Sequence, residues 1–198
     1  FLKSLPPGAR VLDVGCGNNS PRDAKVLRPD LVYHGIDVGD YNQCDSVQYA
    51  DAYTVVAPES FAQAVAANQG MMDAVVSSHN LEHCDDPAGV LRGMAAALRP
   101  DGLLYLAFPC EESLHFPRRR GTLNFRHVRT QNEVPTWQWV LDSLAPAGLA
   151  VEFRRNRYRP PMLAAIGLLF EPVGWATGRT DPVGATWALY GFESVIWA

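Results

Sequence analysis

The chain has 198 residues, of which 47% are hydrophobic and 19% charged, with a formal net charge of −4. This length predicts one domain, residues 1–198, built around a single core. No apolar run reaches the roughly 18 residues of a membrane span, and an acidic chain has no overall positive field to hold nucleic acid. We therefore expect neither a membrane span nor a nucleic-acid partner.

The cysteines are Cys16, Cys44, Cys84 and Cys110, which lie far apart and form no C-x-x-C pair. This spacing predicts neither a zinc knuckle nor a thiol redox centre. The chain opens without the basic and apolar series of a secretory signal. These features together predict a reduced, cytoplasmic setting.

Apolar runs typical of strands alternate with segments typical of helices, which predicts βαβ units. We expect an α/β fold, doubly wound, with a mostly parallel seven-stranded sheet and helices on both faces. The helix after the first strand is expected to begin with Ser20 as its N-cap and to end before Pro29. The expected strands are 9–14, 31–36, 46–49, 74–78, 103–108, 149–155 and 186–196, and the other expected helices are 60–68 and 87–98.

Two segments of the second half need a separate interpretation. Thr130 and Glu133 have capping-box spacing ahead of a helix that contains Trp137. The apolar run 162–170 is too short to cross a bilayer. We expect it to form a core helix at the edge of the sheet rather than a contact with a partner or a lipid.

Glycines and acids follow the predicted strands, where a doubly wound sheet binds its ligands. Gly15 and Gly17 follow the first strand and allow a sharp turn close to a ligand, and Asp37 follows the second strand. An acid about 20 residues after such a loop typically binds ribose hydroxyls. The combination indicates an adenosine-type ligand, although a G-x-G alone is a weak signal.

A nicotinamide dinucleotide is the alternative ligand, because the same architecture serves NAD(P)-dependent oxidoreductases. Their fingerprint has a third small packing residue where this chain has Ser20, which is expected to cap a helix instead. The short helix after it is also a poor support for a pyrophosphate. A cofactor-binding subunit without catalytic activity is a further alternative.

The segment V-L-D-V-G-C-G-N-N at residues 11–19 resembles the first motif of the class I S-adenosylmethionine-dependent methyltransferases, which have a Rossmann-like fold. Later segments are similar to further motifs of that family, in the same order. They are G-I-D-V at 35–38, A-D-A at 50–52, D-A-V-V-S-S-H-N-L-E-H at 73–83 and L-R-P-D-G-L-L-Y-L-A-F-P at 98–109. The resemblance implies S-adenosylmethionine as cofactor and methyl transfer as the reaction.

The resemblance also implies a role for individual residues. The methionine end of the cofactor would be held by Asp13 and by the backbone of Gly15, Cys16 and Gly17. Asp37 would bind the ribose and Val38 the adenine ring, while Asp51 and Ala52 would face the polar edge of the adenine. His79 would line the pocket, although a core histidine is an equal alternative. Asn19 replaces a glycine of the family pattern, and asparagine tolerates the left-handed backbone that such a loop requires.

Methyl transfer from a sulfonium requires alignment of the acceptor more than acid–base chemistry. If a hydroxyl is the acceptor, His79 is the first candidate for a catalytic base and His83 the second. His79, His83 and Cys84 do not predict a metal site, because Asn80 stands where zinc enzymes of this spacing carry glutamate and no third ligand is evident.

A basic segment at 111–129 contains His115, Arg118, Arg126 and His127, which are candidates to bind an anionic acceptor. A solvated lid is an equally good interpretation. The expected function is methyl transfer to a small-molecule acceptor, at a hydroxyl of a sugar or related metabolite. A homodimer is compatible with the sequence.

Overall fold

The computed structural model describes residues 1–17, 19–39, 48–127, 133–181 and 183–198. A seven-stranded sheet crosses the molecule in the order β3-β2-β1-β4-β5-β7-β6. Only β7 runs antiparallel to the neighbouring strands, so the predicted mostly parallel α/β sheet is confirmed. The strands are β1 (Arg10–Val14), β2 (Val32–Asp37), β3 (Ala52–Val55), β4 (Met72–Ser78), β5 (Leu98–Pro109), β6 (Phe153–Arg155) and β7 (Glu193–Trp197).

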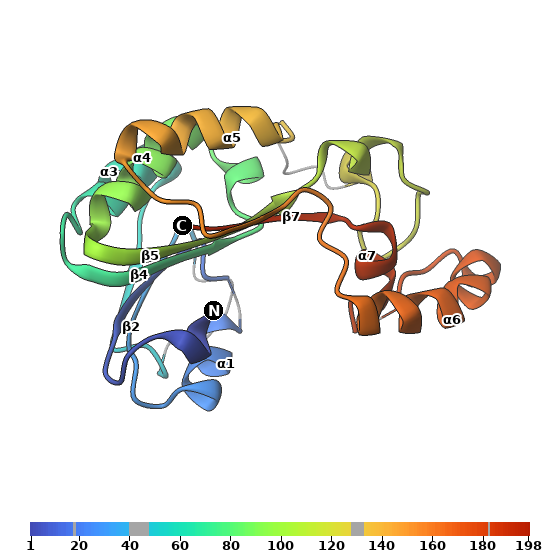
Figure 1. Ribbon diagram of the computed structural model, residues 1–198, viewed down its shortest axis with the longest axis horizontal. Coiled ribbons are helices and arrows are strands. Elements are labelled where there is room, and N and C mark those ends of the chain that lie inside the picture. The colour runs from blue at the N-terminus through green and yellow to red at the C-terminus, as the bar shows by residue number, and fades with distance from the viewer. Residues whose placement is uncertain (18, 40–47, 128–132, 182) are drawn as a thin grey trace.

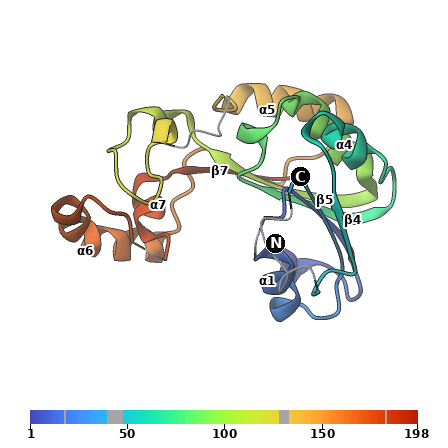
Figure 2. The same ribbon diagram turned by 180° about the vertical axis from the view of Figure 1, so that it is seen from behind.

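Helices cover the two faces of the sheet unequally. In both views, α3, α4 and α5 lie on one face, whereas α1 and the N-terminus lie on the other (Figures 1 and 2). Helices α6 and α7 stand beyond the end of the sheet, next to the connection between β5 and α5. The helices are α1 (Ser20–Leu27), α3 (Phe61–Ala66), α4 (Pro87–Ala97), α5 (Trp137–Leu144), α6 (Pro161–Thr177) and α7 (Ala185–Tyr190).

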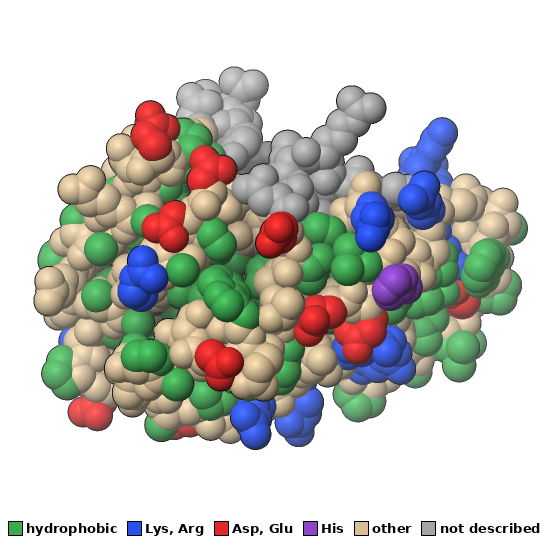
Figure 3. Space-filling view, turned by 90° about the horizontal axis from the view of Figure 1, so that it is seen from above, with side chains coloured by type: hydrophobic (Ala, Val, Ile, Leu, Met, Phe, Trp, Pro, Cys, Tyr) green, Lys and Arg blue, Asp and Glu red, His purple; other side chains and the backbone are tan. Residues whose placement is uncertain are grey.

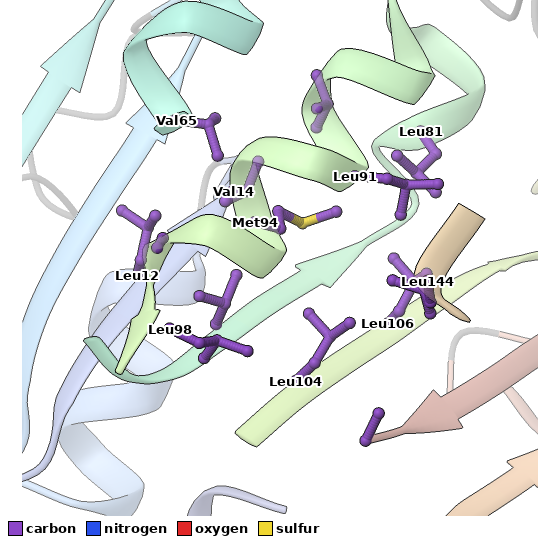
Figure 4. Close-up of a cluster of buried hydrophobic side chains, with 14 of the residues drawn as sticks. Leu12, Val14, Val65, Leu81, Leu91, Met94, Leu98, Leu104, Leu106 and Leu144 are labelled. Carbon is purple, nitrogen blue, oxygen red and sulfur yellow. The ribbon is translucent and has the colours of Figure 1, made fainter. Parts of the chain in front are cut away.

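The main core lies between the sheet and α3, α4 and α5 (Figure 4). Leu91 and Met94 of α4 are fully buried against leucines of β1 and β5 such as Leu12 and Leu104. Burial of one such side chain stabilises the fold by roughly 1.5–3 kcal/mol. This packing holds the carboxyl ends of β1 and β4 in place, and the polar loops of the molecule begin there.

The predicted third strand, 46–49, is wrong. Residues 46 and 47 lie outside the described part of the chain, and residues 48 and 49 form a turn. β3 instead begins at Ala52, opposite His34 of β2. The carboxylate of Asp51 fixes this register, because it accepts hydrogen bonds from the Tyr33 N–H at 2.7 Å and from Lys25 Nζ at 2.6 Å.

The predicted strand 186–196 is half wrong, because residues 185–190 form α7 and only 193–197 form β7. Asp181 lies just before α7 and stabilises its first turn. Its carboxylate accepts hydrogen bonds from the N–H groups of Val183 and Ala185 at 2.9 and 2.8 Å and from that of Thr186. These contacts satisfy amides at the start of the helix that no helical carbonyl reaches.

Two predicted helix caps also differ from the structure. The N-cap of α1 is Asn19, and Ser20 is the first helical residue. The hydroxyl of Thr136 caps α5 by accepting a hydrogen bond from the Trp139 N–H at 3.2 Å. Thr130, the first residue of the predicted capping box, lies outside the described residues.

The apolar run 162–170 forms a helix, but it is not a core helix at the edge of the sheet. It belongs to α6, where Met162, Leu168, Leu169 and Phe170 are exposed. α6 packs on α7 through Gly167, whose missing side chain leaves room for the Ala185 carbonyl. One side of the helix is therefore covered, and the opposite side faces solvent.

Candidate functional site

A cleft of about 850 Å³ lies at the carboxyl ends of β1, β2 and β4. Strand order reverses between β1 and β4, so this is the position at which doubly wound sheets bind ligands. Several predicted site residues line it, namely Gly15, Gly17, Asp37, Val38, His79 and His83. The structure thus brings together candidates from three separate parts of the chain.

The glycine loop closes one side of the cleft. Gly15 has φ +75°, and a Cβ on it would lie 2.3 Å from Oδ1 of Asn80. Gly17 has φ +54° and open space where a Cβ would point. The first glycine therefore allows close packing against the loop after β4, and the second leaves backbone accessible to a ligand.

Asp37 ends β2 and is buried beside this loop. Its Oδ2 accepts a hydrogen bond from the Gly17 N–H at 2.8 Å, and its Oδ1 accepts one from the Val38 N–H at 2.7 Å. Each carboxylate oxygen can accept a further hydrogen bond, which suits a pair of neighbouring hydroxyl donors. The arrangement fits the ribose of an adenosine cofactor.

The side chains of Asp13 and Cys16 are not among those that line the cleft. Burial raises the pKa of Asp13 to about 7, with the Asp37 charge adding to the effect, although the Tyr33 hydroxyl donates to Asp13 at 2.5 Å and opposes it. Burial likewise raises the pKa of the Cys16 thiol to about 12. That thiol packs against Gly35, so these side chains support the loop from behind.

Asp51 and Ala52, the predicted adenine contacts, are not among the residues that line the cleft. Both residues stand at the start of β3, level with Tyr33 and His34 of β2. Asp37 ends β2, three residues beyond His34 and four beyond Tyr33, which is roughly 10–13 Å farther along at about 3.3 Å per residue. Val55 is the β3 residue that pairs with Asp37, and the following Pro58, Glu59 and Phe61 line the cleft instead.

His79 follows β4 and lies between two carboxylates. Its Nε2 is 2.7 Å from Oε1 of Glu193, and its Nδ1 is 3.3 Å from Oε1 of Glu82. The ring packs against Trp187 and Phe192, with centroid distances of 5.2 and 5.8 Å. His79 also has φ 53°, a left-handed conformation that is unusual outside glycine and clusters at functional sites.

The surroundings of His79 determine its charge. Burial lowers the pKa of His79, but the hydrogen bonds and charges of Glu193 and Glu82 outweigh burial and raise it to about 9. The ring is therefore an imidazolium at neutral pH. It lines the cleft as a positive charge held by two acids, and not as a neutral base.

His83 and Cys84 also line the cleft, and His83 is exposed there. Among the described residues, no group of three or more His, Cys, Asp or Glu side chains is arranged to hold a metal ion. The role of His83 as an acid–base group stays a prediction, and its side chain is one of those that line the cleft.

A second cavity, of about 960 Å³, lies between the β5–α5 connection, α6 and α7. Trp187 lines this cavity, and its ring contacts that of His79, which lines the cleft, at a centroid distance of 5.2 Å. The other walls include Phe170, Val173 and the arginines Arg120 and Arg179.

Three of the predicted substrate-binding residues, His115, Arg118 and Arg126, are not among the residues that line either cavity. His115, Arg118 and Arg126 are exposed, and the side chain of His127 lies outside the described residues. Figure 3 shows Lys and Arg side chains gathered with a histidine toward the right-hand end of the molecule. Arg120, another arginine of the basic segment, lines the second cavity.

The sequence also missed the acids that hold His79. Glu82 had a local signal, because it follows His79 by three residues and forms a buried part of the same loop. Glu193 had none, because 114 residues separate it from His79. Within the described residues, the buried Nδ2 of Asn80 and Oε2 of Glu82 have no hydrogen-bond partner, so the loop after β4 retains capacity for polar contacts.

Comparisons with known proteins agree with this geometry. Residues 1–155 match the family model described as a methyltransferase domain. The chain is similar to a ubiquinone biosynthesis O-methyltransferase of Xanthomonas campestris pv. campestris (strain B100), with 36% identity over 107 residues. That match covers 51% of this chain and 43% of the relative, so the chain corresponds to less than half of the relative's length.

Solved structures share the fold at low sequence identity. An S-adenosylmethionine-dependent methyltransferase from Mesorhizobium loti superposes with a TM-score of 0.63 at 16% identity, over 99% of this chain and 94% of that one. A SAM-dependent methyltransferase from Archaeoglobus fulgidus gives a TM-score of 0.58 at 16% identity, over 96% and 85% of the two chains. The chain therefore belongs to the methyltransferase domain family and is a class I S-adenosylmethionine-dependent member of it.

Proposed function

We propose that this chain transfers the methyl group of S-adenosylmethionine to a hydroxyl of a small-molecule acceptor. The observation that carries the proposal is the cleft itself, in which Gly15, Gly17 and Asp37 surround a space beside the imidazolium of His79. The O-methyltransferase name of the similar proteins supports oxygen as the methylated atom.

The cleft residues fit the cofactor in chemistry and in space. Asp37 would accept hydrogen bonds from the ribose hydroxyls, Val38 would pack on the adenine, and the Gly15–Gly17 backbone would adjoin the methionine end. The bound cofactor supplies a methyl group on a positively charged sulfur. Pro58 and Phe61 add apolar walls that exclude water from this part of the cleft.

His79 contributes positioning more than proton abstraction. Since the ring already carries a proton at neutral pH, it holds Glu82 and Glu193 in place and is not free to accept a proton from the acceptor. Glu193 is the more exposed of the two acids, with 30% of its side chain accessible against 0% for Glu82. Glu193 and His83 are therefore our candidates for taking the proton of an acceptor hydroxyl.

The second cavity is our candidate for the acceptor site, because Trp187 in its wall contacts His79 in the wall of the cleft. A sugar or related metabolite is the acceptor that the sequence favours. The walls formed by Phe170, Val173 and Trp187 extend that class to acceptors with an apolar body, and Arg120 and Arg179 suit an anionic group.

Calorimetric titration with S-adenosylhomocysteine tests the cofactor site. Replacing Asp37 with alanine should weaken binding by about 1–3 kcal/mol, or roughly 5- to 150-fold, because hydrogen bonds to a charged group are lost. Asp51→Ala is the matched control and should bind like the wild type, since Asp51 lies at the other end of β2. Equal losses in the two variants, or binding of NADH in place of S-adenosylhomocysteine, would overturn the assignment.

A turnover assay with methyl-labelled cofactor tests the reaction. The acceptor panel should contain sugars, sugar phosphates, phenols and isoprenoid phenols, with label in the product read by mass spectrometry. We expect an O-methylated product from at least one of these classes. Cofactor binding without turnover on the whole panel would favour a non-catalytic, cofactor-binding subunit.

A further inference from the structure

The outer face of α6 is an apolar surface that no described element covers. The helix has 17 residues, or roughly 25 Å at 1.5 Å per residue. Met162 and Leu169 are 77% and 78% exposed, among the highest values for large apolar side chains in the described residues. The outer face is uncharged, and its exposed residues include Met162, Ala165, Leu168, Leu169, Pro172, Trp175 and Ala176.

The one acid of α6 points away from this face. Glu171 forms a bidentate ion pair with Arg119, at 2.6 and 2.8 Å, and accepts a hydrogen bond from the Tyr190 hydroxyl at 2.5 Å. The Arg119 guanidinium lowers the pKa of Glu171, so the pair stays charged and internally compensated. Glu171 therefore anchors α6 to α7 and contributes no free negative charge to the outer face.

Arginines adjoin both ends of α6. Arg157 and Arg159 precede the helix and donate hydrogen bonds to the Tyr190 carbonyl. Arg179 follows the helix, and its backbone forms an isolated β-bridge with that of Arg120. Within the described chain, none of these arginines forms an ion pair with a carboxylate. The protein is acidic as a whole, with net charge −4, yet Arg120, Arg159 and Arg179 are exposed near the ends of this helix and form a basic rim.

We propose that the outer face of α6 lies on the surface of a membrane that contains anionic lipids. Such a surface offers apolar chains to the leucines, an interfacial zone to Trp175 and negative headgroups to the arginine rim. The proposal concerns a helix that lies on the bilayer: among the described residues, no helix is long and apolar enough to cross one.

A second copy of the chain fits the same surface less well. A two-fold dimer through α6 would place each basic rim next to its equivalent. The outer face offers no acid to pair with these charges, because Glu171 is already bound by Arg119. Like charges brought together at an interface repel each other and oppose association, whereas anionic lipid headgroups attract the same arginines.

Vesicle flotation of the intact chain tests the proposal without requiring cofactor or activity. We expect the protein to float with vesicles of phosphatidylcholine and phosphatidylglycerol, and to remain behind with pure phosphatidylcholine. Leu169→Glu should reduce flotation by about tenfold or more, because it places a charge in the apolar contact. A combined Arg120→Gln and Arg179→Gln variant should weaken binding and flatten its salt dependence.

Val26→Glu is the matched control, because Val26 is 77% exposed but belongs to α1, which lies near the N-terminus and apart from α6 (Figure 1). It should float like the wild type, and thermal unfolding should show that all variants fold. No flotation of the wild type, or equal flotation of the Leu169 and Val26 variants, would overturn the proposal. A dimer that Leu169→Glu dissociates in light scattering would assign the face to a second copy instead.

Discussion

Replacing His79 with glutamine removes a positive charge that Glu82 and Glu193 hold in the folded protein. Glutamine keeps a donor for one of these acids but has no titrating ring. The difference between the variant and the wild type therefore reports how much the protonated ring stabilises the fold.

The magnitude follows from the pKa of His79, which is about 9 in the folded protein against 6.5 for an unperturbed histidine. That difference corresponds to roughly 3 kcal/mol of stability. Because the folded pKa is the higher one, the whole contribution is present below about pH 6.5. It is lost as the pH rises through about 9, when the folded ring also gives up its proton.

Urea unfolding of both proteins at several pH values from about 6 to 10 measures this contribution. The wild type should lose roughly 3 kcal/mol of unfolding free energy more than His79→Gln across this range. Other titrating groups, such as Asp13, are common to the two proteins and cancel in the difference. Parallel pH profiles for the two proteins would show that the ring is not held as an imidazolium.

The two glycines of the loop should respond differently to alanine. In either variant the alanine costs about 1–2 kcal/mol, because its backbone is left-handed. In Gly15→Ala the new Cβ also collides with Asn80, so this variant should lower the melting temperature more than Gly17→Ala. Equal losses would contradict the packing of this loop. Asp13→Asn should remove a pH-dependent cost, because burial raises the pKa of Asp13 from 3.8 to about 7 and the wild type loses stability as the pH rises between these values. The variant keeps an acceptor for the Tyr33 hydroxyl. Because asparagine does not titrate, the stability of the variant relative to the wild type should grow by roughly 3 kcal/mol between pH 5 and pH 7.5 in urea unfolding. A constant difference would refute the buried-charge argument.

The buried strands were predictable because each is a short apolar run bounded by proline, glycine or an acid. β1 and β4 are the clearest cases, and their side chains are buried almost throughout. β3 lacks this signal because it lies at the edge of the sheet and most of its residues are exposed. Its register depends on the contacts of Asp51 with Lys25 and Tyr33, which join distant parts of the chain.

The same distinction separates the site residues that were predicted from those that were missed. Gly15 and Asp37 each follow a parallel strand, and the carboxyl ends of such strands meet at one edge. Glu193 reaches His79 from the start of β7, the antiparallel strand beside β5. Nothing near either residue in the sequence indicates that pairing, because it depends on where β7, the last strand of the chain, is placed in the sheet.

Net charge and hydropathy failed to predict the surface around α6 because both are averages over position. A net charge of −4 is compatible with a basic rim when acids elsewhere outnumber it, and an apolar run reads the same whether it is buried or exposed. The structure separates these cases through two contacts. Gly167 lets α6 approach α7 on one side, and Glu171 pairs with Arg119 on that same side. The apolar residues on the opposite side therefore face outward, beside arginines that form no ion pair within the described residues. A helix arranged in this way is suited to an anionic surface rather than to a protein core.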